Sequence, residues 1–136
     1  MAAEVFLALD VGDARIGVAL SRSGVIAEPV GTIERIGRRQ TLAAVAEWVE
    51  RERVTTCVIG LPLLAGGAEG EQAEKSHAFA RSLQRRLPSL AIVMHDERWS
   101  SAEARAMGDG RAMARYGEDA VAAMVILQGY LDNRTK

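Results

Sequence analysis

The stretch EVFLALDVGDARIGVALS, residues 4–21, decides the fold. Val5 to Leu9 is an uninterrupted apolar run that predicts a buried strand, and Asp10 ends it. Gly12 supplies turn chemistry, and residues 15–21 are rich in Ile, Val and Ala, which predicts a second strand paired with the first in a hairpin. A carboxylate at the end of so apolar a strand raises the question of what it does there.

The rest of the chain predicts an α/β fold with one mixed sheet. A third short strand is expected at residues 27–33, so the chain begins with an antiparallel meander. Further strands are expected at 54–60 and 90–97, and helices at 38–52, 71–87, 100–107 and 118–132. Residues 63–70 predict a mobile surface loop, and residues 108–117 give no clear pattern and are expected to be mobile. Because strands alternate with helices in the second half, we expect three antiparallel strands followed by parallel ones, with helices on both faces, in one domain over residues 1–136.

Composition narrows the function classes. The 17 basic and 18 acidic residues leave a net charge of −1, which is not typical of a strongly basic nucleic-acid binder. No segment approaches the roughly 20 apolar residues of a membrane-spanning helix, so no membrane partner is expected. The lone Cys57 cannot pair within the chain, which favours a reducing, cytoplasmic location, and it is expected to be a small buried hydrophobic residue.

Arginines occur in three local clusters, which are the sequence's candidate nucleic-acid patches. These clusters lie at residues 35–39, 51–53 and 81–86. A solvated helix face is the ordinary interpretation of each cluster.

Carboxylates gather at the predicted carboxyl ends of the strands. Asp10 ends the first strand, and Asp96 and Glu97 end the last one. Asp119 opens the final apolar helix. Because sites in α/β sheets form at the carboxyl ends of strands, we expect these acids to meet at one edge, with only one of the adjacent pair pointing into the cluster. Converging carboxylates repel one another unless a cation neutralises them, and a hard divalent ion such as Mg²⁺ does so and also supports phosphodiester cleavage.

Each acid also has a structural interpretation. Asp10 could make an Asx-turn to the backbone of Gly12. Glu97 could pair at the surface with Arg98. Asp119 could cap its helix, a role that is compatible with binding a metal.

Four blocks of the sequence together resemble the YqgF family, also called RuvX. They are LALDVGDARIGVALS (7–21), VIGLPLLAGGAEG (58–70), HDERWSSAEA (95–104) and EDAVAAMVILQGYLD (118–132). The resemblance implies an RNase H-like fold of the Holliday-junction-resolvase type. It also implies nuclease activity, with processing of the 5′ end of the 16S ribosomal RNA precursor or resolvase-like action on DNA.

The resemblance carries over residue by residue. Asp10, Glu97 and Asp119 match the acidic positions of the family blocks, which implies that they are the catalytic residues and the ligands of Mg²⁺ or Mn²⁺. The chain departs from the family pattern at Ser100 and Ser101, where threonines are usual. It also departs in the middle loop, which has Leu64 and Gly66 in place of Asn and Asp, and before the last aspartate, where a lysine is common.

Substrate contacts are expected beside these acids. Arg15, Arg98 and Arg115 are candidates for binding the substrate backbone, although each could instead form a structural salt bridge. Trp99 is a candidate for stacking on a base.

Three functions from different classes are therefore open. The first is a divalent-metal nuclease acting on RNA, or on branched or single-stranded DNA, with ribosomal particles as a candidate partner and as a monomer or homodimer. The second is ATP binding, because residues 9–20 also resemble the phosphate hairpin of the actin, Hsp70 and sugar-kinase superfamily, whose members need two such domains. The third is a non-catalytic nucleic-acid-binding module.

Overall fold

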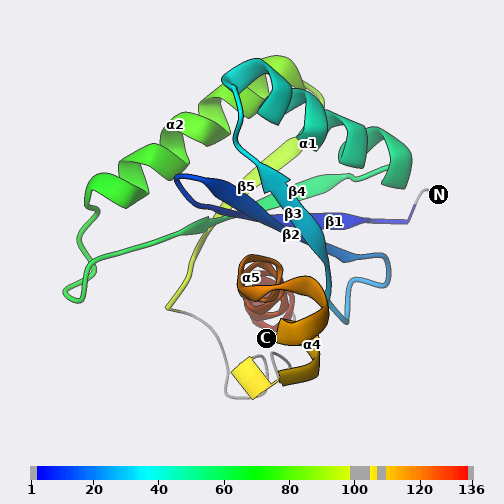
Figure 1. Cartoon of the computed structure of the whole chain (residues 1–136), viewed down its shortest axis with the longest axis vertical. Coiled ribbons are helices and arrows are strands. Elements are labelled where there is room, and N and C mark those ends of the chain that lie inside the picture. Colours follow the sequence, from blue (N-terminus) through cyan, green and yellow to red (C-terminus); the bar gives the residue numbers. More distant parts are fainter. Residues whose placement is uncertain (1–2, 99–104, 107–109, 135–136) are drawn as a thin grey trace.

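A five-stranded mixed sheet lies between two helical layers in the computed structural model, which describes residues 3–98, 105–106 and 110–134 (Figure 1). The strands are β1 (Phe6–Val11), β2 (Arg15–Ser21), β3 (Glu28–Glu34), β4 (Thr56–Leu61) and β5 (Ala91–Asp96). Their order in the sheet is β3-β2-β1-β4-β5. Strand β2 runs antiparallel to both β1 and β3, whereas β1, β4 and β5 run parallel to one another. The predicted meander followed by parallel strands is confirmed.

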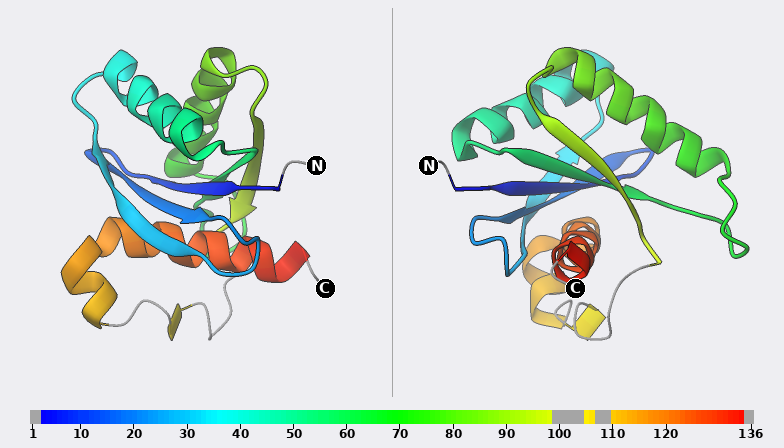
Figure 2. Two further views of the ribbon diagram at one scale, coloured as in Figure 1. Left: turned by 90° about the vertical axis from the view of Figure 1, so that its right-hand side faces the viewer. Right: turned by 180° about the vertical axis from the view of Figure 1, so that it is seen from behind.

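Two helices cover one face of the sheet and one long helix crosses the other (Figures 1 and 2). The helices are α1 (Arg38–Glu52), α2 (Glu71–Arg86), α4 (Gly110–Tyr116) and α5 (Glu118–Arg134). Helices α1 and α2 pack on one face, and α5 packs on the opposite face with α4 at its start. The prediction of helices on both faces is confirmed.

One segment differs from the sequence prediction. Residues 110–116, expected to be mobile, form α4, and Gly117 with φ +88° separates this helix from α5. Ala, Met and Arg inside this segment are good helix formers, and the flanking glycines concealed that pattern. The loop predicted at 63–70 is present, and its ends are joined by an isolated bridge between Leu63 and Glu69 and by a hydrogen bond from the Leu64 amide to the carbonyl oxygen of Ala68 at 2.9 Å. The helix predicted at 100–107 lies outside the described residues except for 105–106.

Alternation of side chains along the strands gives the two faces different surfaces. Large apolar side chains such as Leu9, Ile16 and Ile59 face α1 and α2. Small ones such as Ala8 and Ala19 face α5. The predicted burial of Cys57 is confirmed, and desolvation raises the pKa of its thiol to about 12.

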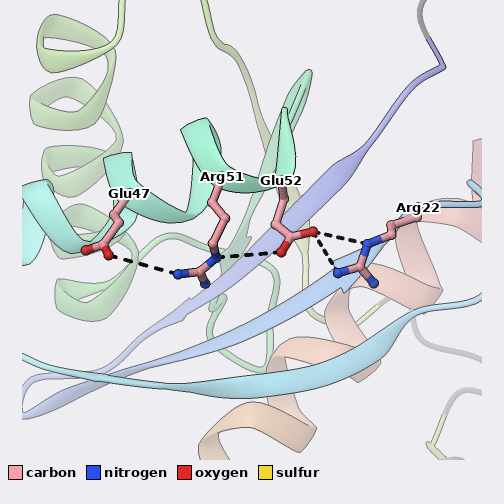
Figure 3. A network of polar contacts seen from close by, with 4 residues as sticks. All are labelled: Arg22, Glu47, Arg51 and Glu52. Carbon is pink, nitrogen blue, oxygen red and sulfur yellow. Dashed lines mark hydrogen bonds and ion pairs between the residues drawn. The ribbon is translucent and has the colours of Figure 1, made fainter.

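A network of charges joins the turn after β2 to the carboxyl end of α1 (Figure 3). Arg22 donates to Glu52 at 2.7 and 3.1 Å, and Arg51 lies 3.7 Å from Glu52 and 4.0 Å from Glu47. Each of these arginines therefore has a carboxylate partner. In the part of the chain that the structure describes, no helix is both long and apolar enough to cross a membrane.

Candidate active site

Asp10 lies near the carboxyl end of β1, on the face covered by α5. It follows Phe6 and Ala8 on the same face of the strand, both of which pack against α5. Its partner across the β1–β2 ladder is Gly17. A Cβ atom at Gly17 would lie 1.8 Å from the carbonyl oxygen of Asp119, so only glycine lets the first turn of α5 rest on β2 at this point. The hairpin and the helix thus bring Asp119 toward Asp10.

A second glycine makes room for Glu97. This glutamate follows β5 directly, and its side chain lies over β4 at Gly60. A Cβ atom at Gly60 would lie 2.6 Å from Glu97 Oε1 and 2.6 Å from Ile126 Cδ1 of α5. Glycines on both strands that flank β1 therefore let acids from β5 and α5 approach Asp10.

The acidic side chains are electrostatically coupled. Burial, and then repulsion from Asp119, raises the pKa of Asp10. Burial, followed by repulsion from Asp10 and Asp96, raises the pKa of Glu97 to about 7. Such shifts are typical of carboxylates gathered where a cation can neutralise them.

Asp119 has a cationic partner already. Its Oδ2 accepts a hydrogen bond from Arg15 Nε at 2.8 Å, and this pair shields the carboxylate. Asp119 also lies in the first turn of α5, where a negative charge favours the helix dipole. Arg15 therefore forms the structural salt bridge that the sequence left open as an alternative to substrate binding.

The adjacent side chains of Asp96 and Glu97 point to opposite faces of the sheet and have different neighbours. Asp96 points away from Asp10 and accepts hydrogen bonds from Arg98 at 2.7 to 3.1 Å, which lowers its pKa. Arg98 thus pairs with Asp96 and not with Glu97. The Asx-turn considered for Asp10 is not formed, because the amide of Gly12 donates to the carbonyl oxygen of Arg15 at 2.9 Å.

The other predicted substrate contacts are placed differently. Arg115 lies in α4 with its guanidinium carbon 5.3 Å from the centre of the Tyr116 ring. Trp99 lies outside the described residues. The sequence interpretation missed Gly17 and Gly60, whose importance depends on strand register. Their signal in the sequence is a glycine inside an otherwise apolar, β-branched strand.

The residues present fit a divalent cation in part. Among the described residues, no three His, Cys, Asp or Glu side chains lie close enough to form a complete metal site. Asp10 and Glu97 are hard oxygen donors whose mutual repulsion a cation would relieve. Asp119 is the third acid at this edge, and its carboxylate is bound to Arg15.

Comparison with known proteins identifies this RNase H-like sheet as the fold of a class of nucleases. The family model of RuvX, described as Holliday junction resolvase, matches residues 4–133. The chain therefore belongs to the RuvX family.

Similar sequences and structures cover nearly the whole chain. A relative from Synechococcus sp. is 42% identical over 94% of this chain and 78% of its own length, and one from Chloroflexus aurantiacus is 40% identical over 96% and 88%. Both carry the printed name "Putative pre-16S rRNA nuclease". Thermus thermophilus RuvC, in a complex with Holliday junction substrate, covers 97% of this chain and 96% of its own at a TM-score of 0.65 and 12% identity. At that identity the match supports the RNase H-like fold.

Proposed function

We propose that this chain hydrolyses phosphodiester bonds in RNA with the aid of Mg²⁺ or Mn²⁺, and that it processes the 5′ end of pre-16S ribosomal RNA. The observation that carries the proposal is the pair of partly buried carboxylates, Asp10 and Glu97, whose pKa values are raised at one edge of the sheet. The name shared by relatives at about 40% identity supports the substrate. Residues 1–136 would act as one nuclease domain.

Asp10 and Glu97 are the residues that would hold the cation, and Asp119 would complete the set. When bound, a divalent cation supplies Lewis acidity toward a phosphate oxygen. The two carboxylates contribute the negative charge that selects a cation at this edge, and Gly60 keeps the Glu97 carboxylate close to the sheet. Arg15 holds Asp119 in place and presents a guanidinium of the kind that binds phosphate at the same edge.

Resolution of Holliday junctions is the less favoured alternative. The family description names it, but the relatives at about 40% identity carry the ribosomal RNA name. A resolvase acting on a symmetric junction would require a two-fold dimer, whereas an RNA-processing nuclease can act as a monomer or a homodimer. The free, buried Cys57 is consistent with action on ribosomal particles in the reducing cytoplasm.

Cleavage of labelled RNA tests the proposal. Wild type and Asp10→Asn are incubated with a precursor spanning the 5′ end of 16S RNA and with a four-way DNA junction, each with Mg²⁺ or Mn²⁺. Loss of several kcal/mol of charge stabilisation predicts a decrease of about 1,000-fold in cleavage by the variant. The matched control is Glu50→Gln, which neutralises an exposed acid of α1 and should cleave at the wild-type rate.

Each result has a definite meaning. Equal activity of wild type and Asp10→Asn removes Asp10 from the mechanism. Preference for the junction over the precursor would transfer the function to the resolvase alternative. RNA binding that persists in EDTA with no cleavage under either metal would support a non-catalytic binding module.

A further inference from the structure

The second helical layer carries a basic groove that the acidic edge does not use. The groove lies between α1 and α2 on the face of the sheet opposite α5 and encloses about 690 Å³. Five cations and one acid supply its charged lining: Arg35, Arg38, Lys75, Arg81, Arg85 and Asp13. A smaller hollow lined by Arg38, Arg39, Leu42 and Arg86 adjoins it. This concentration of positive charge stands out in a chain whose net charge is −1.

Three of the four arginines of the groove form no salt bridge within the described part of the chain. Lys75 pairs with Asp13 at 3.1 Å and Arg81 with Glu74 at 3.4 Å. Across residues 3–98, 105–106 and 110–134, no ion pair to Arg35, Arg38 or Arg85 is found. Arg22 and Arg51, near the carboxyl end of α1, do have acidic partners (Figure 3).

The fold holds the positive charges of Arg38 and Arg85 close together, where they repel each other. Ser82 is buried, and its hydroxyl accepts a hydrogen bond from Arg38 of α1 and another, at 3.4 Å, from Arg85 of α2. One neutral oxygen thus brings two guanidinium groups to the same point from opposite walls. Arg38 and Arg39 also lie in the first turn of α1, which holds no acid and where cations oppose the helix dipole. Repulsion of this kind is relieved when an anion enters.

The groove adjoins the turn that follows Asp10. Arg35 Nη1 donates to the carbonyl oxygen of Gly12 at 2.9 Å, and Lys75 pairs with Asp13 in the same turn. Both faces therefore meet at the β1–β2 turn, where one long polyanion can contact the acidic edge and the groove.

The lining favours backbone recognition over base recognition. The aromatic residue of the groove is Phe79, which is buried with the Arg35 guanidinium carbon 5.5 Å above its ring. A buried ring offers no platform for stacking an unpaired base. A groove lined by guanidinium groups, with its ring buried, favours contacts with phosphates, which a double-helical segment presents on its outside.

We propose that the groove between α1 and α2 binds the phosphate backbone of a double-helical RNA segment that flanks the strand held at the acidic edge. This inference rests on the proposed function, since it assigns a second contact with the same RNA. The residues that carry it are Arg35, Arg38 and Arg85, and it assigns no base specificity to them.

Binding measured without metal tests this groove apart from cleavage. The probes are a short fluorescent single-stranded RNA and the same strand extended by a hairpin, titrated in EDTA between about 50 and 200 mM salt. The variant is Arg38→Gln with Arg85→Gln. The matched control is Arg22→Gln with Arg51→Gln, which removes the same charge from the paired network of Figure 3.

The groove variant should bind the hairpin RNA about tenfold more weakly, with a salt slope shallower by about 2, because two phosphate contacts are lost. Its affinity for the short strand, and both affinities of the control, should stay at wild-type values. Arg85→Gln alone keeps the Arg38–Ser82 hydrogen bond and should give about half the change in slope, so an unstable double variant does not end the test.

Three outcomes overturn the proposal. They are no hairpin binding by wild type, an unchanged salt slope in the groove variant, and an equal loss for the hairpin RNA and the short strand. The binding assay needs no catalysis, so failure of the nuclease proposal would appear in the cleavage assay while the groove result stands by itself.

Discussion

The two faces of the sheet are packed in opposite ways. On the α5 face, glycines and alanines let helix and strand backbones approach closely, so that a Cβ atom at Gly17 would overlap Asp119. On the α1 and α2 face, large side chains such as Leu9 and Ile59 separate the helices from the sheet. The first face places acidic groups by backbone contact, whereas the second forms a thick core and carries its charged groups on the outer surface of the helices.

This difference explains where each kind of group lies. Acidic side chains that must approach one another require short, rigid supports, which backbone contact provides. Arginines that contact the phosphate backbone of a nucleic acid tolerate a looser arrangement, because a guanidinium group can approach a phosphate from several directions. Substitution of the glycines on the α5 face tests whether that face is as rigid as its contacts indicate.

The largest effect on stability is expected for Gly17→Ala. The new methyl group would meet the backbone of α5 1.8 Å away, and a helix cannot move as a side-chain tip does. We expect the free energy of unfolding in urea to fall by about 3 kcal/mol or more. Gly31→Ala is the matched control, because nothing lies within 4 Å of its Cβ position, and it should stay within about 0.5 kcal/mol of wild type. Equal stability of both variants would show that α5 does not rest on β2.

Gly60→Ala should affect activity more than stability. Its methyl group would meet the ends of two flexible side chains, Glu97 and Ile126, which can shift. We expect the free energy of unfolding to fall by about 1–2 kcal/mol. We expect cleavage to slow by roughly 10-fold or more, because Glu97 is displaced. The activity of Gly31→Ala should match wild type. If Gly60→Ala loses stability but cleaves at the wild-type rate, the position of Glu97 does not matter for cleavage.

The stability of the metal-free protein should decrease as the pH rises from about 4.5 to about 7. The pKa of Glu97 is 4.5 in its ordinary state and about 7 in the folded chain, so the folded state binds more protons in this window. Since the slope of unfolding free energy with pH follows protons bound in the unfolded state minus those bound in the folded state, it is negative here. The raised pKa of Asp10 acts in the same direction.

Urea unfolding in EDTA at several pH values checks this expectation. Glu97→Gln should flatten the decrease, because it removes the titrating group and leaves Asp10 as the remaining contributor. An unchanged pH profile in that variant would assign the decrease to other groups.

The smallest effect is expected for Arg15→Gln. Its pair with Asp119 is largely exposed, with 52% and 36% of the two side chains accessible. We expect the free energy of unfolding to fall by less than about 1 kcal/mol. Arg22→Gln should cost more, because its partner Glu52 is only 18% exposed and accepts two hydrogen bonds. Thermal or urea unfolding of both variants gives the order, and the reverse order would make the Arg15 pair a structural anchor of α5.

The sequence predicted the elements with strong periodicity. The helix at 38–52 has the predicted bounds, and the helix from residue 118 begins where it was expected. Strand alternation also separated Asp96 from Glu97 correctly. The helix at 110–116 was missed because glycines at 108, 110 and 117 dominate a short segment.

The remaining features depend on contacts between distant parts of the chain. Gly17 and Gly60 become important only when the register sets them against Asp119 and Glu97. The pair of Arg15 and Asp119 joins residues 104 positions apart, so the sequence could offer it only as one option. The basic groove likewise forms because α1 and α2 lie side by side on one face of the sheet, which brings two clusters of arginine together.

The buried thiol of Cys57 gives the protein a built-in reporter. Because its side chain is fully enclosed on the interior strand β4 and its pKa is about 12, alkylating reagents cannot reach a thiolate in the folded chain. Labelling therefore requires the core between the sheet and helices α1 and α2 to open. The rate of modification at this single cysteine would measure how often that core opens, with no engineered probe.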